Sequence, residues 1–368
     1  MNLIIPHYGR GGGAGKYIDF IYKSMSNVTD TRFAGYYSNQ YVGKIFPTSR
    51  ILDFTFNALT IPLYSGVKTR NIIFYIFRFL FLFPFFYIFS YNFPKKTASF
   101  SSLILTSTIQ LPLILLNFKI LRKTKKIIFI QENIILDGLV GFICIFLLKR
   151  FDVVVAINSY EQKRLASKGI KTTLVRNNFD FEVSELENND INSYDAVYVG
   201  GELEIKGFLV VIDLFKKLSI KKRLNILLLG EYSKRGRKYI EKANKLAKND
   251  SKLFLIGRVE SCNEYYLKSK FLLLPIKSAH FCRPAIEVGL LRKTFIVTDL
   301  TGLSDFSIPN YNCLTFKPGD TNSFIEVFEK LLDDKLRNEL ERNNFNFSSK
   351  YIADSNIQEF LSKFEINK

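Results

Sequence analysis

A glycine-rich segment near the amino terminus, residues 9–16, has residue types suited to binding an anion. It follows the apolar run 3–5, typical of a buried strand, and precedes the apolar-periodic stretch 17–22, which predicts a helix. Doubly wound domains begin with this strand, loop and helix, and the free N–H groups at such a helix start attract anions. The glycine spacing fits neither the phosphate loop of NTPases nor G-x-G-x-x-G. A tight turn without a ligand stays the alternative.

Two polar residues, Glu132 and Asn133, form a second candidate site. They follow a predicted buried strand at 127–130, after Gln131. Parallel α/β sheets bind ligands at the carboxyl ends of their strands, so both side chains are expected to contact a ligand. Glu132 is the better candidate for a polar or acid–base role. A solvated loop carboxylate is the alternative reading.

Length and composition limit the function classes. The 368 residues are 47% hydrophobic and 23% charged, which indicates a folded chain of two to three domains. Four scattered cysteines without a C-x-x-C pair are typical of free thiols in a reducing cytosol. His7 and His280 are the only histidines, and no D-x-D motif occurs, so no metal site is expected.

The positive charge is concentrated in the first half of the chain. Residues 1–180 hold 23 Lys and Arg against 8 Asp and Glu, whereas residues 181–368 hold 29 against 26. This asymmetry predicts two domains with different partners. No nucleic-acid-binding signature occurs, so an anionic membrane surface or a lipid phosphate is the expected partner of the basic half.

An aromatic segment at 72–93 also indicates a membrane surface. It contains 12 Phe or Tyr among 22 residues, is interrupted by Arg78 and Pro84, and has basic residues on both sides. Residues 72–89 are just long enough to cross a bilayer, but the strands before and after them belong to one sheet on one side. An interfacial segment is therefore favoured over a buried helix or a true span.

Short apolar strands alternate with helices along both halves, which predicts two parallel sheets. In the first half we expect strands at 103–106, 127–130, 152–157 and 172–175, and a helix at 160–168 with Asn158-Ser159 as its N-cap. An acidic linker occupies 183–194. In the second half we expect strands at 196–199, 225–229, 253–256, 271–274 and 295–298, and helices at 209–218 and 237–250. The predicted domains are 1–182 and 195–350, with a final helix at 351–368 that packs back on the first domain.

Several weak motifs occur in a fixed order in the second half. They are Gly200-Gly201 through Lys206-Gly207, then 228–231, 256–259, 281–287 and 297–299. Together they resemble the C-terminal nucleotide-sugar domain of retaining glycosyltransferases of family 4. The resemblance includes residues 158–170, the segment 176–180 and Gly12-Gly13-Ala14, and it covers nearly the whole chain.

This resemblance implies an α/β fold of the GT-B type, with two Rossmann-like domains facing across a cleft. Lys206 falls on the family's lysine that contacts the donor diphosphate, and Glu287 on the second Glu of E-x7-E, which binds the donor ribose. The other expected donor-binding residues are Gly12, Gly13, Arg258, Val259, Phe281, Cys282 and Arg283.

Three positions depart from the family pattern. The first Glu of E-x7-E is Ala279, the arginine before the lysine is Gly201, and an N-terminal histidine is Gln131. Arg258 or Arg283 could restore the positive charge that Gly201 lacks. Glu132 and Asn133 are expected to contact the acceptor, with Glu132 as the catalytic candidate.

The resulting hypothesis is a peripheral enzyme on the cytoplasmic membrane face. It transfers a sugar from a UDP- or GDP-sugar to a lipid-linked glycan in bacterial polysaccharide synthesis, with retention and without a cofactor or metal. An inactive glycosyltransferase-like scaffold and a nucleotide-sugar epimerase of the same fold are the alternatives. Ala279 and Gly201 favour the scaffold, and the aromatic segment argues against the epimerase.

Overall fold

The structure is a computed structural model, and it describes residues 2–5, 31–33, 102–105, 126–130, 134, 136–175 and 193–351. Several predicted features lie outside the described residues: Gly12, Gly13, Gln131, Glu132, Asn133, the aromatic segment 72–93, the segment 176–180 and residues 352–368. The chain divides into two compact units, Met1–Asp180 with Ala353–Lys368 and Phe181–Ile352.

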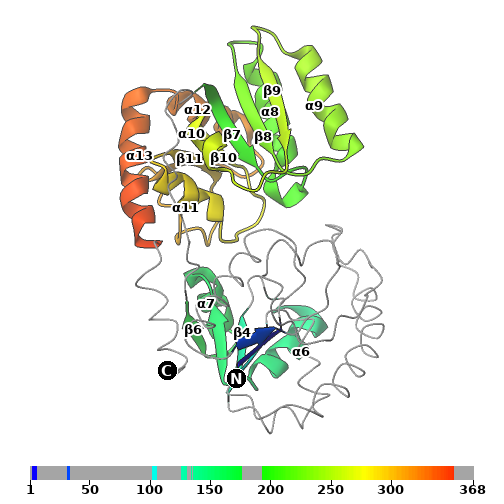
Figure 1. The fold of residues 1–368 in the computed structure, drawn as a ribbon, viewed down its shortest axis with the longest axis vertical. Coiled ribbons are helices and arrows are strands. Elements are labelled where there is room, and N and C mark those ends of the chain that lie inside the picture. Colours follow the sequence, from blue (N-terminus) through cyan, green and yellow to red (C-terminus); the bar gives the residue numbers. More distant parts are fainter. Residues whose placement is uncertain are drawn as a thin grey trace. The chain divides into compact units, whose positions relative to one another are not determined.

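The first unit is built on a parallel sheet. Its described strands are β1 (Asn2–Ile5), β2 (Thr31–Phe33), β3 (Ser102–Leu105), β4 (Lys126–Ile130), β5 (Val153–Ala156) and β6 (Thr172–Leu174). They pair in the order β2-β1-β3-β4-β5-β6, and every pair is parallel. The helices described here are α6 (Gly138–Leu148) and α7 (Ser159–Ala166), shown in Figure 1. Of the predicted cap pair, Asn158 caps α7, because its Oδ1 accepts from Glu161 N at 2.7 Å, and Ser159 is the first residue of the helix.

The second unit contains another six-stranded parallel sheet. Its strands are β7 (Tyr194–Val199), β8 (Asn225–Leu229), β9 (Lys252–Gly257), β10 (Ser269–Leu274), β11 (Thr294–Thr298) and β12 (Cys313–Phe316). They pair in the order β12-β11-β10-β7-β8-β9. Because the middle strands are buried on both faces, they are almost entirely apolar, as the sequence predicts.

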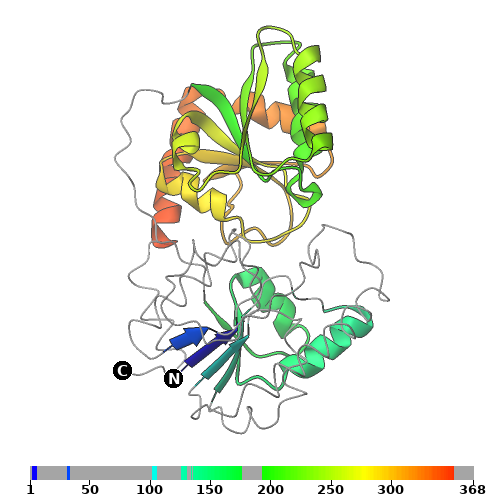
Figure 2. The same cartoon turned by 45° about the vertical axis from the view of Figure 1, so that its right-hand side comes forward.

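Helices cover both faces of this second sheet (Figures 1 and 2). One layer is α8 (Phe208–Leu218), α9 (Lys234–Leu246) and α12 (Thr321–Lys330), in which α8 contacts both others. The other is α10 (Asn263–Leu267), α11 (Arg283–Leu290) and α13 (Asp334–Ser348), in which α11 contacts both others. The first layer and the sheet enclose a continuous apolar core in which Phe215, Phe324 and Phe328 are fully buried.

Strand order changes direction at β7. From β7 the chain builds outward through β8 and β9, and then returns to place β10 on the other side of β7. The connections after β7 and β10 therefore lead to helices on opposite faces, α8 and α11. Such a switch point leaves a crevice at the carboxyl ends of the two strands, where open α/β sheets bind ligands.

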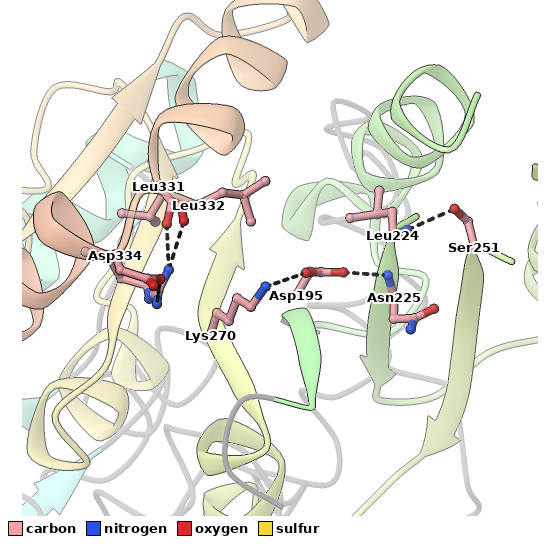
Figure 3. A network of polar contacts seen from close by, with 9 residues as sticks. Asp195, Leu224, Asn225, Ser251, Lys270, Leu331, Leu332 and Asp334 are labelled. Carbon is pink, nitrogen blue, oxygen red and sulfur yellow. Dashed lines mark hydrogen bonds and ion pairs between the residues drawn. The ribbon is translucent and has the colours of Figure 1, made fainter. Parts of the chain in front are cut away.

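Polar contacts fix the opposite, amino-terminal ends of the same strands (Figure 3). Asp195 on β7 accepts from Lys270 Nζ on β10 at 2.9 Å, and from the backbone N–H of Asn225 on β8 at 2.9 Å. Leu224 N donates to Ser251 Oγ at 2.9 Å, which ties the starts of β8 and β9. These contacts hold the register of the central strands at the edge away from the crevice.

The predicted helix at 237–250 differs at both ends from α9. It begins earlier because the Ser233 hydroxyl caps it, accepting from Arg235 N and Gly236 N. It ends at Leu246 because the next residue is extended and because Asn249 and Asp250 have φ of 56° and 54°, outside the helical region. A cap and a left-handed pair therefore set the bounds, and apolar periodicity alone did not show them.

Candidate functional site

Two loops meet at the carboxyl ends of β7 and β10. The 3-10 helix η2 (Glu204–Lys206) follows β7, and its Ile205 carbonyl accepts from Lys277 N, after β10, at 2.9 Å. Gly207 follows η2 with φ of 78°, and a Cβ at this position would lie 1.8 Å from the Pro275 carbonyl oxygen. Only glycine permits this approach, which brings the two loops together at the switch point.

Lys206 lies at this junction and contacts a histidine from the other loop. Its Nζ is 2.6 Å from His280 Nε2, while His280 Nδ1 is 2.9 Å from the Ser278 carbonyl oxygen. An ammonium only donates and a carbonyl only accepts, so the imidazole is neutral, with its proton on Nδ1. Burial, followed by the charge of Lys206, lowers the pKa of His280 to about 4. His280 was not among the predicted site residues.

Gly201 is held between two strand ends. It has φ of 59°, and a Cβ there would lie 2.5 Å from the Glu231 carbonyl oxygen after β8. An arginine at this position, as in the family pattern, would therefore displace the loop that carries Glu231. Glycine at this position therefore allows a close backbone approach, and it also lacks the positive charge that the arginine of the family pattern has.

Glu287 lies on α11 and is buried, with 9% exposure. Its Oε1 is 2.7 Å from Arg283 Nε, and its Oε2 accepts from the Tyr266 hydroxyl at 3.0 Å. Glu287 is therefore not an exposed carboxylate at the start of a helix. Burial, and next the charge of Glu287, raise the pKa of Tyr266 well above its usual value, so its hydroxyl stays a donor. Tyr266, on α10, was not predicted.

A buried amide holds α11 in place beneath this site. Asn344 on α13 donates to the Lys293 carbonyl at 2.8 Å and accepts from Asn312 Nδ2 at 3.1 Å. It also lies 3.4 Å from the Ala285 carbonyl oxygen of α11. Glu287 is therefore carried by a helix whose backbone is bound from the neighbouring helix.

The remaining predicted residues lie after other strands or within the core. Arg258 and the half-buried Val259 follow β9, and Arg258 pairs with Glu231 at 3.0 Å, both side chains being substantially exposed. Phe281 and Cys282 are 8% and 1% exposed. Both residues are therefore almost wholly buried within the second unit.

Comparison with known proteins agrees with this architecture. Residues 182–347 match the sequence model of the family described as "Glycosyl transferases group 1". An uncharacterized glycosyltransferase of Methanocaldococcus jannaschii is 29% identical over 160 residues, which cover 42% of this chain and 43% of that protein. The chain thus spans less than half the length of this curated relative.

Solved structures resemble the whole chain. Sucrose-phosphate synthase from Thermosynechococcus elongatus superposes with a TM-score of 0.76 at 14% identity, covering 100% of this chain and 99% of that one. Anabaena HepE, in complex with UDP and glucose, gives 0.74 at 13% identity, with full coverage of both chains. The chain has the GT-B fold. The predicted fold class is confirmed, and the family that residues 182–347 match is one of glycosyltransferases.

The depressed pKa of His280 predicts a pH-dependent stability. Its pKa is about 4 in the folded chain and ordinarily 6.5, so the unfolded chain binds more protons between these values. The free energy of unfolding should therefore fall as the pH drops through this window. Between pH 7 and pH 5, the free energy of unfolding from urea denaturation should fall by about 2 kcal/mol more in the wild type than in His280→Gln.

The difference between the wild type and His280→Gln separates the effect of His280 on stability from that of other titrating groups. Burial raises the pKa of Glu341 to about 7, and this group acts in the opposite direction because it favours folding at lower pH. Its contribution is common to both proteins and cancels in the difference. Equal losses of unfolding free energy in the wild type and in His280→Gln would contradict the assignment of a neutral, half-buried imidazole.

Proposed function

We propose that this chain is a retaining glycosyltransferase that transfers a sugar from a nucleoside-diphosphate sugar, UDP- or GDP-linked, to a lipid-linked glycan. The observation that carries the proposal is Lys206, whose ammonium lies at the switch point between β7 and β10. The family match over 182–347 supports it, because this range covers nearly all of the second unit. A structural neighbour, Anabaena HepE, is known in complex with UDP-glucose.

The proposed chemistry needs neutralisation of the departing diphosphate. Lys206 supplies one positive charge, and α8 begins two residues later, so its free N–H groups and helix dipole add to it. These groups can stabilise the leaving group without a metal. For retention, we take the departing phosphate to deprotonate the acceptor on the same face of the sugar, as the family resemblance implies.

The acceptor side is proposed to lie in the first unit. Glu132 and Asn133, the acceptor candidates, directly precede Ile134, whose N–H donates to Glu161 Oε1 at 3.1 Å. Arg164 donates to the Ile134 carbonyl at 2.6 Å, so both backbone groups of Ile134 are held from α7. The catalytic role of Glu132 stays a prediction, and the transfer rate of Glu132→Ala tests it.

An exposed apolar face on α6 supports a membrane-associated acceptor. Phe142, Ile143 and Phe146 are 67%, 45% and 50% exposed on one side of this helix. Two basic residues follow, and the Arg150 guanidinium lies 3.7 Å from the Phe146 ring centroid. Aromatic and basic side chains together are typical of segments that bind anionic bilayer surfaces. Within the described part of the chain, no helix is long and apolar enough to span a membrane.

A lipid-linked glycan is the acceptor class that fits this face. The structural neighbour WaaB, a lipopolysaccharide outer core galactosyltransferase, has a TM-score of 0.66 at 15% identity and full coverage. The charge balance of residues 1–180 favours a phosphate-bearing lipid. We therefore place the enzyme peripherally on the cytoplasmic face of the membrane, in surface polysaccharide synthesis.

Donor binding tests the proposal directly. Titration calorimetry with UDP, GDP, ADP and CMP should show binding of one nucleoside diphosphate, weakened about 10- to 100-fold in Lys206→Ala, because a charged hydrogen bond is lost. Glu287→Gln should also weaken it. Lys222→Ala is the matched control, since this lysine pairs with Glu329 at 3.2 Å, near the amino end of β8. Absence of binding by every nucleotide would favour the inactive scaffold.

Vesicle binding tests the membrane assignment. Replacement of both Phe142 and Phe146 by Ser should lower partitioning onto phosphatidylglycerol vesicles by at least about tenfold, since two apolar rings no longer leave water. The control replaces Ile220 and Leu246, each 57% exposed in the second unit, by Ser. Equal partitioning of the two double variants in a flotation assay would show that α6 does not contact the bilayer.

A further inference from the structure

We propose that His280 is a positioning residue for Lys206, holding its ammonium in the direction from which it binds the donor diphosphate. This inference rests on the proposed function. It concerns a residue that the family resemblance does not account for, immediately after Ala279, where the resembled motif has a glutamate.

The imidazole is held at both of its nitrogen atoms. Nδ1 donates to the Ser278 carbonyl at 2.9 Å, within the same loop, and Nε2 accepts from Lys206 Nζ at 2.6 Å. The sulfur of Cys282, itself buried, lies 3.4 Å from the same Nε2. The ring plane is therefore fixed by its own loop before any ligand binds, and it presents one lone pair to Lys206.

A fixed acceptor matters because a lysine side chain is flexible. Its ammonium is carried on a four-carbon stem, and ordering that stem on binding costs conformational free energy. In the free protein, His280 already restricts the stem of Lys206. Of the three N–H donors of the ammonium, one points to Nε2, and within the described part of the chain the other two have no partner and can bind phosphate oxygens.

The acceptor is neutral, and this preserves the charge of Lys206. A carboxylate would hold the ammonium equally well but would cancel its field at the diphosphate. The nearby carboxylate Glu204 pairs instead with Lys277, at 3.3 Å, and within the described residues no ion pair involves Lys206. An imidazole fixed as a neutral acceptor thus orders the lysine while its full positive charge stays directed at the ligand.

Nitrogen NMR tests the contact itself, without a nucleotide. The chain has two histidines, so ¹⁵N-histidine labelling gives two ring systems, and the one missing in His280→Gln is His280. At pH 7 we expect the Nδ1–H form, with a pKa near 4 that rises toward its ordinary value in Lys206→Met. An Nε2–H ring that titrates normally, or a pKa that is unchanged in Lys206→Met, would overturn the proposal.

Nucleotide affinity tests the positioning role. We expect His280→Leu to bind UDP or GDP about tenfold more weakly than the wild type, since it removes the acceptor. His280→Gln should stay within about threefold, because its amide oxygen can accept near the position of Nε2. The wild type and both His280 variants should bind the nucleosides uridine and guanosine equally well. A general structural defect would weaken nucleoside binding too. Lys222→Met serves as the charge-matched control for Lys206→Met.

The outcomes separate this inference from the proposed function. If Lys206→Met loses nucleoside-diphosphate affinity while His280→Leu binds as the wild type does, the positioning role is wrong and the donor site stands. If the wild type binds no nucleoside diphosphate, the proposed function fails, and the positioning role fails with it. A loss for His280→Leu that extends equally to the nucleosides would indicate general disruption and overturn the inference.

Discussion

The parallel pairing of β7 with β10 is the constraint on which the second unit depends. It makes two strands that are distant in sequence end at the same edge, and the chain leaves them toward opposite faces. Lys206 and His280 are 74 residues apart, yet their side-chain nitrogens lie 2.6 Å from each other because of this pairing. The sheet edge at which open α/β sheets bind ligands thus carries residues whose positions the core strands determine.

Close backbone packing fixes the positions of the loops at this edge of the sheet. Gly201 and Gly207 both have left-handed backbone conformations and both approach carbonyl oxygens of neighbouring loops. A side chain at Gly207 would separate the loops that carry Lys206 and His280, and one at Gly201 would displace the loop that carries Glu231. Beneath them, Asn344 binds the backbone around α11 and so supports the helix that carries Glu287. The site is therefore held by backbone contacts from below, and its charged groups are left at the strand ends.

The sequence predicted two parallel α/β domains because apolar runs of strand length alternate with amphipathic helices, and because parallel strands are buried on both faces. The GT-B type followed from the family resemblance and not from this pattern. It also placed Lys206 between a strand and the next helix, and Arg258 shortly after a strand. In the structure Lys206 ends η2, between β7 and α8, and Arg258 follows β9. Helix bounds were less accurate where a cap or a left-handed residue decided them, as at Ser233 and Asn249. Periodicity carries no information about such local hydrogen bonds.

Side-chain partnerships could not be predicted from the sequence. The bonds of Glu287 to Arg283 and Tyr266 join α11 to α10, and they depend on how these helices pack. Arg283 was proposed to restore a missing charge for the donor, but its guanidinium is engaged by Glu287. One feature of the sequence could have pointed to His280. It is one of two histidines in the chain, and it stands next to Ala279, where the sequence departs from the family motif. Its role needed the register of β7 and β10.

A crystal structure with a bound nucleoside diphosphate tests the central claim most directly. The account predicts the diphosphate at the carboxyl ends of β7 and β10, within hydrogen-bond distance of Lys206 Nζ, with His280 Nε2 still facing the same ammonium. A nucleotide bound elsewhere would contradict it, for example in the groove of about 400 Å³ between α9 and β9 that Asn244 and Phe254 line. That result would show that the switch point of the second sheet is not the donor site.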